Sequence, residues 1–306
     1  MPELLLPSGA HWRRCLTAGA ARALPRAGHV RLALLAALLI GTALLASHWL
    51  APRPADLPPG PLLGQALARG KLLVGVREYR RPALPGATVA AEPDVLDAAL
   101  AKELGAYLGV PVELVGLPAA QQEAALAEGR IDLLIAGSAE RPAPVGALAV
   151  PPSPRHDEGA LLVLRGLPLE AAAPLRGRSL CLAEGSPYRH QLVARHGAQA
   201  RLYPSAVHAI AAFQAGECAA LAEEASLVDW LLQQPEWRFH RRLPIALRAE
   251  DAGHVRLPAG DAQGRAWLGA ALADWQRRGA QDAALAHWIG ELSVDVLKLD
   301  QGLICH

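Results

Sequence analysis

One sequence pattern occurs twice in this chain of 306 residues. Residues 125–137 read ALAEGRIDLLIAG, and residues 212–224 read AFQAGECAALAEE. In each, the end of an amphipathic helix is followed by a glycine, Gly129 or Gly216, and then by a short apolar run. This order indicates a helix, a left-handed cap and a buried parallel strand whose far end opens onto a cleft. Two such units predict two α/β lobes that face each other, an arrangement that suits closure around a small ligand.

The remaining periodic segments extend this pattern to most of the chain. Apolar runs and helix signals predict strands at 71–76, 110–116, 131–137, 159–166, 175–186, 200–205 and 218–224, and helices at 96–109, 119–128, 187–197, 206–215, 226–234 and, in two pieces, 264–290. Residues 239–249 are expected to return the chain to the first lobe. The predicted organisation is a segment 1–31, a membrane helix 32–50, a Pro-rich linker 51–69, lobe 1 from 70–162 and 243–292, lobe 2 from 163–242, and a tail 293–306. Two crossings between lobes predict a hinge.

The segment 32–50 is the most apolar part of the chain, and only His48 in it can carry a charge. A helix of this length spans roughly 28 Å, which is enough for the hydrocarbon core of a bilayer. The residues before it carry five arginines and one acid, so the positive-inside rule keeps them in the cytoplasm. We therefore expect an uncleaved signal anchor with the folded domain exported. A cleavable signal peptide is the competing interpretation.

The net charge of +1 gives no reason to expect nucleic acid as a partner. Cys181 and Cys218 lie on or beside two predicted strands of the second lobe, and an exported domain permits a disulfide between them. Two buried thiols are the favoured interpretation. The sequence has no C-x-x-C, H-E-x-x-H, G-x-S-x-G or P-loop pattern, so we expect neither a metal site, a cofactor nor an enzyme.

Four phrases, in order, resemble those of the family 3 periplasmic solute-binding proteins, the amino-acid receptors of ABC transporters. They are LAKELGAYLGVPVELV (100–115), ALAEGRIDLLIAG, LRGRSLCLAEGS (175–186) and LADWQRRGAQDAALAHWIG (272–290). The resemblance covers about 70–292 and is similar to the solute-binding-like domain of membrane-bound lytic transglycosylase F, whose peptidoglycan-cleaving domain has no counterpart here. It implies a two-lobed periplasmic-binding-protein (Venus flytrap) fold, here preceded by one transmembrane helix, with the domain in the periplasm of a bacterium.

The resemblance also implies where a ligand would bind. Family members hold an amino-acid carboxylate with a Ser or Thr after the third strand and an Arg beyond it, and hold the ammonium with an acid at the end of a lobe-two strand. In this chain the first two positions fall on Ala139 and Pro144, so Ser138 and Arg141 are the candidate substitutes. The acid position falls on Glu224, with Glu223 beside it.

Two further places are candidates for ligand contact. Family members often place an aromatic residue after the first strand, which makes Tyr79 a candidate to cover the ligand, and Arg77 with its basic neighbours could bind an anion. Ser186 follows Gly185 at a predicted helix N-terminus, which suits an anion or is an ordinary cap. Asp97 and Asp132 are expected to be structural, as a helix cap and a turn ligand.

Two functions are consistent with these features. The first is a membrane-anchored solute-binding protein that closes around a small polar solute, amino-acid-like or an organic anion, and presents it to a permease or sensor. The second is a degenerate solute-binding fold that serves as a non-enzymatic accessory or regulatory subunit of an envelope complex. Because the expected Ser or Thr and the expected Arg are missing, the accessory role has more support here than in a typical member of the family.

Overall fold

The computed structural model describes residues 34–36, 38–40, 42, 52–82, 90–135, 147–150, 158–167, 175–248 and 255–303. The chain divides into two compact units, residues 1–51 and 52–306. The described residues of the expected membrane segment are helical, and the rest of that prediction lies outside the described part. Within the part of the chain that is described, none of the helices combines the length and the apolar character needed to cross a bilayer.

The first sheet has a parallel core of three strands, as the apolar runs predict. Its elements are β1 (Leu72–Tyr79), β2 (Glu92–Pro93), α3 (Val95–Leu108), β3 (Val112–Leu117), α4 (Ala119–Ala127), β4 (Leu133–Ile135), β5 (Ala147–Val150) and β12 (Val255–Pro258). β1 lies between β3 and β4 and is parallel to both. β12 pairs in antiparallel with β4 and with β5, and α3 and α4 contact β1. The carboxyl end of β1 therefore meets those of β3 and β4 at one edge of the sheet.

The second sheet repeats this plan. Its elements are β6 (Glu158–Leu164), β7 (Ser179–Ala183), a short helical segment (Gln191–Arg195), β8 (Gln199–Tyr203), α5 (Ala206–Gln214), β9 (Ala220–Glu224), α6 (Ala225–Gln233), β10 (His240–Arg242) and β11 (Leu247–Arg248). β7 is parallel to β8 and β9, whereas β6 is antiparallel to β9, β10 and β11. Short 3₁₀ turns lie at Pro54–Asp56 and Pro235–Trp237.

The repeated sequence pattern forms the same structure in both places. Gly129 follows α4 with φ of 68°, and Gly216 follows α5 with φ of 76°. This left-handed conformation strains residues that have a Cβ, which explains the glycine at both positions. Each glycine ends its helix and directs the chain into the central strand β4 or β9, so the prediction of two α/β units is confirmed.

The chain crosses between the sheets at other points than expected. β6 was predicted to leave the first lobe at 159–166, but it pairs with β9 in the second sheet. Residues 239–249 were expected to return the chain, but β10 and β11 pair with β6. The crossings therefore fall between Val150 and Glu158 and between Arg248 and Val255. β11 has only two residues, which is too short for the alternation of apolar and polar residues that marks a strand. Its sequence therefore resembled a connection between the lobes.

Part of the expected linker 51–69 belongs to the folded core. Residues Gly60–Arg69 form helix α2, which packs against α7 (Ala262–Arg277). Leu63 and Ala66 are fully buried there, and the Leu62 amide donates to the Asp261 carboxylate at 3.0 Å. Pro61 lies in the first turn of this helix, where the missing N–H costs nothing.

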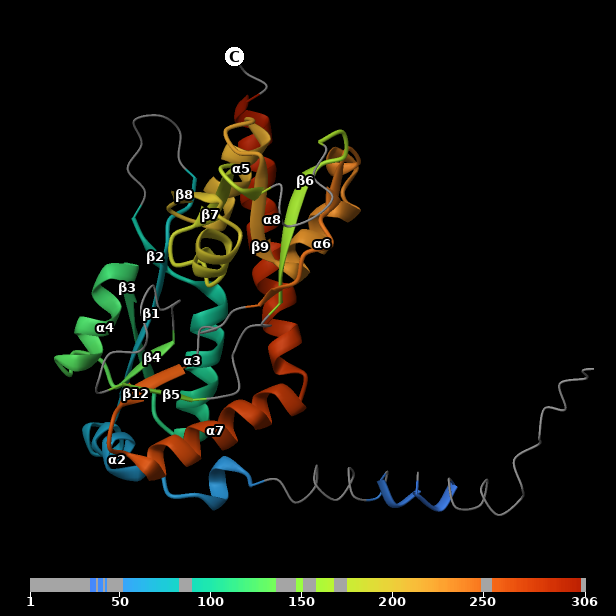
Figure 1. Ribbon diagram of the computed structural model, residues 1–306. Coiled ribbons are helices and arrows are strands. Elements are labelled where there is room, and N and C mark those ends of the chain that lie inside the picture. Colours follow the sequence, from blue (N-terminus) through green and yellow to red (C-terminus); the bar gives the residue numbers. More distant parts are fainter. Residues whose placement is uncertain are drawn as a thin grey trace, which may run out of the picture. The chain divides into compact units, whose positions relative to one another are not determined.

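The C-terminal helix is longer than the sequence indicates. The two helices expected around Gly279 are α7 and α8 (Ala280–Leu303), but α8 continues through most of the expected tail 293–306. Its buried side chains share one apolar core with α3 of the first sheet and α5 of the second; they are Leu285, Trp288, Leu292 and Val296. In Figure 1 this helix, in red, runs beside both. α8 therefore links the two sheets by packing.

Cys181 of β7 and Cys218 before β9 form a disulfide. The favoured interpretation of two buried thiols was wrong. β7 and β9 are adjacent parallel strands, and the two Cα atoms lie 5.6 Å apart, a separation typical of disulfides. A bond of this kind is typical of an oxidising compartment.

Candidate functional site

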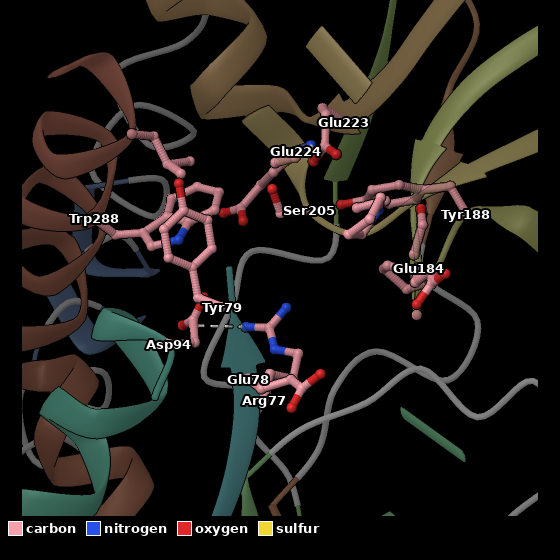
Figure 2. A pocket seen from close by; sticks show the side chains of 17 residues that line it. Arg77, Glu78, Tyr79, Asp94, Glu184, Tyr188, Ser205, Glu223, Glu224 and Trp288 are labelled. Atoms are coloured by element: carbon pink, nitrogen blue, oxygen red, sulfur yellow. Dashed lines mark hydrogen bonds and ion pairs between the residues drawn. The ribbon is translucent and has the colours of Figure 1, made fainter. Parts of the chain in front are cut away.

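A cavity of about 90 Å³ lies where the carboxyl ends of both sheets meet (Figure 2). β1 and the turn before α3 form one side, and the end of β9 with the residues that follow β7 and β8 forms the other. α8 contributes Trp288 and Leu292. A second cavity of about 280 Å³ adjoins the first and extends along the start of α4 to Gln122, and Arg77 and Glu184 line both. Ligands of α/β sheets bind at such strand ends.

Four of the six candidate residues surround this cavity. Arg77, Tyr79, Ser186 and Glu224 line it, although they come from three separate parts of the chain. The other two, Ser138 and Arg141, lie outside the described residues. The cavity is therefore assembled from the strand ends that the repeated pattern predicts, and what these side chains do there depends on their partners.

Arg77 is bound by carboxylates of α3. Its Nε and one terminal nitrogen each donate to Asp97 at 2.8 Å, and it lies 3.5 Å from Asp94. Burial alone would lower the pKa of Arg77, but the charges of Asp97 and Asp94 hold it above the ordinary value. Asp97 was expected to cap α3; Asp94 does so, accepting from the amides of Leu96 and Asp97. Asp97, one turn in, faces β1 instead.

The basic cluster after β1 is not an open anion site. Arg80 pairs with Glu78 at 3.2 Å, and Arg81 pairs with Asp295 at 3.2 Å. With Arg77 held by Asp97, each of the three guanidinium groups already has a carboxylate partner. The expectation that these arginines replace the missing anion ligand therefore loses its main support.

Tyr79 has a partner that no local pattern could indicate. Its hydroxyl donates to Asp295 of α8 at 2.8 Å, and Asp295 is only 1% exposed. Burial and this hydrogen bond raise the pKa of Tyr79 well above its ordinary value. Asp295 also accepts from Lys298 at 3.3 Å. The tyrosine is thereby fixed in place as a wall of the cavity.

Asp132 acts as a structural ligand, as expected. It accepts from the amide of Leu73 at 2.8 Å and pairs with Arg69. This ties the start of β4 to β1 and to the end of α2. The function of Asp132 is thus to hold the first sheet together, away from the cavity.

Ser186 lines the cavity but does not begin a helix. The helix expected at 187–197 is reduced to residues 189–195, which include the segment Gln191–Arg195, and a turn through Pro187 precedes it. The Tyr188 ring is buried beside Gly159 of β6, where any added Cβ would come within 2.5–2.7 Å of the ring. This packing fixes the turn. Ser186 is therefore not at a helix N-terminus, and its role as a ligand contact stays a prediction.

Two adjacent glutamates form the end of β9. Glu223 is 8% exposed and Glu224 is 4% exposed, and both line the cavity (Figure 2). Glu224 accepts from Ser226 at 3.3 Å, and Glu223 Oε2 accepts from the Glu224 amide at 3.4 Å. Among the described residues, Glu223 Oε1 has no hydrogen-bond partner. Burial, with a smaller contribution from Glu224, raises the pKa of Glu223 to about 7.

The lining of the cavity is strongly acidic. One guanidinium and five carboxylates surround it: Arg77, Glu78, Asp94, Glu184, Glu223 and Glu224. A buried carboxylate oxygen without a partner is costly, and a cationic donor offsets that cost. In the described ranges, no set of three or more His, Cys, Asp or Glu side chains is placed to hold a metal ion. The acidic lining suits a cationic group.

The sequence indicated Glu223 only through its position next to Glu224. Alternating residues of a regular strand point to opposite faces, so a continuous strand would bring only one of the two to the cavity. At Glu224 the strand ends and α6 begins, and the backbone changes direction there. Both side chains can therefore reach the cavity.

No protein-family model matches this sequence, and no curated protein matches it significantly. Solved structures do match its fold. An amino acid ABC transporter substrate-binding protein from Streptococcus pneumoniae, bound to L-arginine, is 16% identical with a TM-score of 0.59, over 75% of this chain and 98% of that one. An arginine-binding protein from T. maritima is 16% identical with a TM-score of 0.55, over 75% of this chain and 100% of that one.

A third match is an ancestral amino-acid-binding protein described as a precursor of cyclohexadienyl dehydratase. It is 17% identical with a TM-score of 0.55, over 74% of this chain and 98% of that one. At such identities the likeness concerns the fold, and the ligands in these descriptions belong to those proteins. This chain has the two-sheet α/β fold of the substrate-binding proteins of amino acid ABC transporters.

Proposed function

We propose that this protein is an extracytoplasmic solute-binding protein whose ligand is a small organic cation, amino-acid-like in character. The unpartnered Oε1 of Glu223, buried in a cavity lined by five carboxylates and one guanidinium, is the observation that carries the proposal. A cation placed there gives that oxygen a charge-assisted hydrogen bond, which is stronger than a neutral one. The organic anion considered at first suits this lining poorly.

The ligand chemistry follows from how the charges are divided. Glu223 and Glu224 suit an ammonium or guanidinium group, because the second-sheet residues that line the cavity include no basic side chain. Arg77 lies across the cavity on the first sheet and is held by Asp97, and we propose it as a secondary contact for a ligand carboxylate. Two solved structures with this fold are described as bound to L-arginine, which has both groups. We propose Tyr79 as an apolar wall and Ser186 as a polar contact.

Ser138 and Arg141 remain proposed contacts for the ligand carboxylate. Both follow β4, whose carboxyl end meets that of β1 at the cavity edge of the first sheet. We further propose that residues 32–50 anchor the protein in the bacterial inner membrane, with the folded unit in the periplasm. The disulfide between Cys181 and Cys218 fits that compartment. Anchoring would keep the domain near a permease or sensor partner.

One observation favours the alternative of an accessory subunit with a retired cleft. α8 packs on α3 and α5 at once, and Asp295 binds the hydroxyl of Tyr79 beside the cavity. A helix fixed to both sheets opposes the hinge motion by which two lobes open and close. In that case the acidic cavity would no longer bind a solute, and the protein would bind a protein partner instead.

Thermal unfolding of the full-length protein in mild detergent distinguishes the two. L-arginine, L-lysine and L-glutamate are each added to the wild type. A ligand at a hundred times its dissociation constant stabilises by about 2.7 kcal/mol. We expect L-arginine or L-lysine to raise the midpoint and L-glutamate not to do so.

The variant Glu224→Gln should abolish the shift, whereas Glu236→Gln, at an exposed site away from the cavity, should retain it. An unchanged midpoint with every cation would count against solute binding and favour the accessory role. A shift with L-glutamate alone would contradict the assignment of a cation.

A further inference from the structure

We propose that this cavity exchanges a proton for its ligand: Glu223 holds a proton while the cavity is empty and releases it to solvent when the cationic group binds. The inference rests on the proposed function and specifies it. It predicts that the ligand is a strong base and that binding is linked to pH.

The geometry around Glu223 provides for only one of its two oxygens. Oε2 accepts from the Glu224 amide at 3.4 Å, while Oε1 is buried without a partner among the described residues. The neighbouring Glu224 carboxylate already accepts from Ser226 and lines the same cavity. Two adjacent buried carboxylates disfavour each other's charge, so one of them holds a proton more easily than an isolated glutamate.

Positive charge near Glu223 is already committed elsewhere. Arg77 is the only basic residue that lines this cavity in the described part of the chain, and it donates to Asp97 at two positions. The other charged groups on this cavity are all acidic: Glu78, Asp94, Glu184 and Glu224. Arg77 favours the ionised form of Glu223 only in part, and burial outweighs it, so the pKa of Glu223 stays raised.

The elements packed against β9 add no such cation. β6 places Gly159 and Ala160 opposite the two glutamates, and its Glu158 is exposed. On α5, His208 lies behind Ser205, with its Nδ1 2.8 Å from Ser205 Oγ, and burial lowers the pKa of His208. On α6, Asp229 pairs with Arg242 at the surface. β7 contributes no ionisable side chain.

The same environment sets the pH range of the exchange. Burial raises the pKa of Glu223 to about 7, so the empty cavity is protonated at mildly acidic pH. A bound cation favours the ionised carboxylate and displaces the proton. The ligand group must itself stay charged throughout this range. A guanidinium or primary ammonium does so, whereas an imidazole would lose its own charge.

Calorimetric titration of the full-length wild type with L-arginine tests the exchange. Two buffers with different enthalpies of ionisation are compared at several pH values. Near pH 6 we expect release of about one proton per ligand, falling toward none by about pH 8. The affinity should rise by up to about tenfold per pH unit below pH 7 and then level off.

Glu223→Gln should bind L-arginine more weakly and without proton release or pH dependence, whereas Glu236→Gln should behave as the wild type. If the wild type binds L-arginine with the same heat in both buffers at every pH, the proton exchange is overturned while the solute-binding function stands. If no cation binds at any pH, both fall. The wild-type comparison requires no variant to fold.

Discussion

The two sides of the cavity treat charge in opposite ways. On the first-sheet side, Arg77 is bound by Asp97, and the hydroxyl of Tyr79 by Asp295. On the second-sheet side, the lining residues include Glu184, Glu223 and Glu224 and no basic side chain. Internal pairing makes the first side a part of the scaffold. On the second side, Glu223 Oε1 has no hydrogen-bond partner among the described residues, so a bound ligand can supply one, which is what a binding surface requires.

The largest expected effect on stability comes from a variant that breaks the ion pair between Arg77 and Asp97 on the first-sheet side. Asp97→Asn would remove the closer of the two carboxylates that pair with Arg77, in a site where Asp97 is 3% exposed, and would leave Asp94 at 3.5 Å. We expect a loss of about 3–5 kcal/mol in the free energy of unfolding, because removing one partner of a buried ion pair leaves part of the desolvation cost of the other without compensation. Urea unfolding measures it.

The matched control for that variant is Glu128→Gln at the surface. Glu128 pairs with Arg130 where both side chains are about half exposed. Such a pair contributes less than about 1 kcal/mol. If Asp97→Asn cost no more than Glu128→Gln, the scaffold role of Arg77 would be untenable.

A smaller effect concerns the second side and pH. Unfolded glutamate titrates near 4.5, and burial raises the pKa of Glu223 to about 7, so the folded protein holds an extra proton between these values. The contribution of Glu223 to stability is therefore greatest below pH 4.5 and is lost as pH rises to 7. The slope reaches about 1.4 kcal/mol per pH unit, or about 3 kcal/mol in all.

Urea unfolding of the protein without ligand, at several pH values between 5 and 8, measures this slope. Glu223→Gln should flatten it, and Glu236→Gln should leave it unchanged. A wild-type profile identical to that of Glu223→Gln would show that Glu223 is ionised in the empty cavity, against the account.

The smallest expected effect is the loss of the hydrogen bond that fixes Tyr79 on the first-sheet side of the cavity. Tyr79→Phe removes the hydrogen bond to the buried Asp295 and should cost about 1.5–3 kcal/mol, as bonds to charged groups do. Tyr203→Phe is the matched control, because its hydroxyl bonds Glu217 at the surface, also at 2.8 Å. We expect the control to change the urea midpoint little. Equal losses would mean that α8 does not hold Tyr79 more firmly than solvent would.

Sequence reasoning succeeded where the signal was local. Gly129 and Gly216 mark helix ends followed by buried strands, and these short-range features predicted both α/β units and the position of Glu224 at a strand end. Asp132 was also correctly read as structural. Each of these inferences needs only a few consecutive residues, because helix caps and strand ends are set by neighbouring backbone.

Most of the failures involve partners that are distant in sequence. Asp295 lies 216 residues from Tyr79, and the extension of α8 that carries it reads as an ordinary tail. The bond between Cys181 and Cys218 depends on the adjacency of β7 and β9, which no local pattern specifies. The role of Asp97 depends on the approach of α3 to β1. These contacts decide which charges are offset and therefore which side binds.

One measurement tests the central claim most directly: the coupling between the charge of the ligand and the charge of Glu224. Calorimetric affinities of L-arginine and of L-citrulline, its neutral isostere, are determined for the wild type and for Glu224→Gln. The account predicts that the wild type prefers L-arginine and that Glu224→Gln removes most of this preference, giving a coupling free energy of about 1.5 kcal/mol or more. Equal affinity of the wild type for both ligands would contradict it.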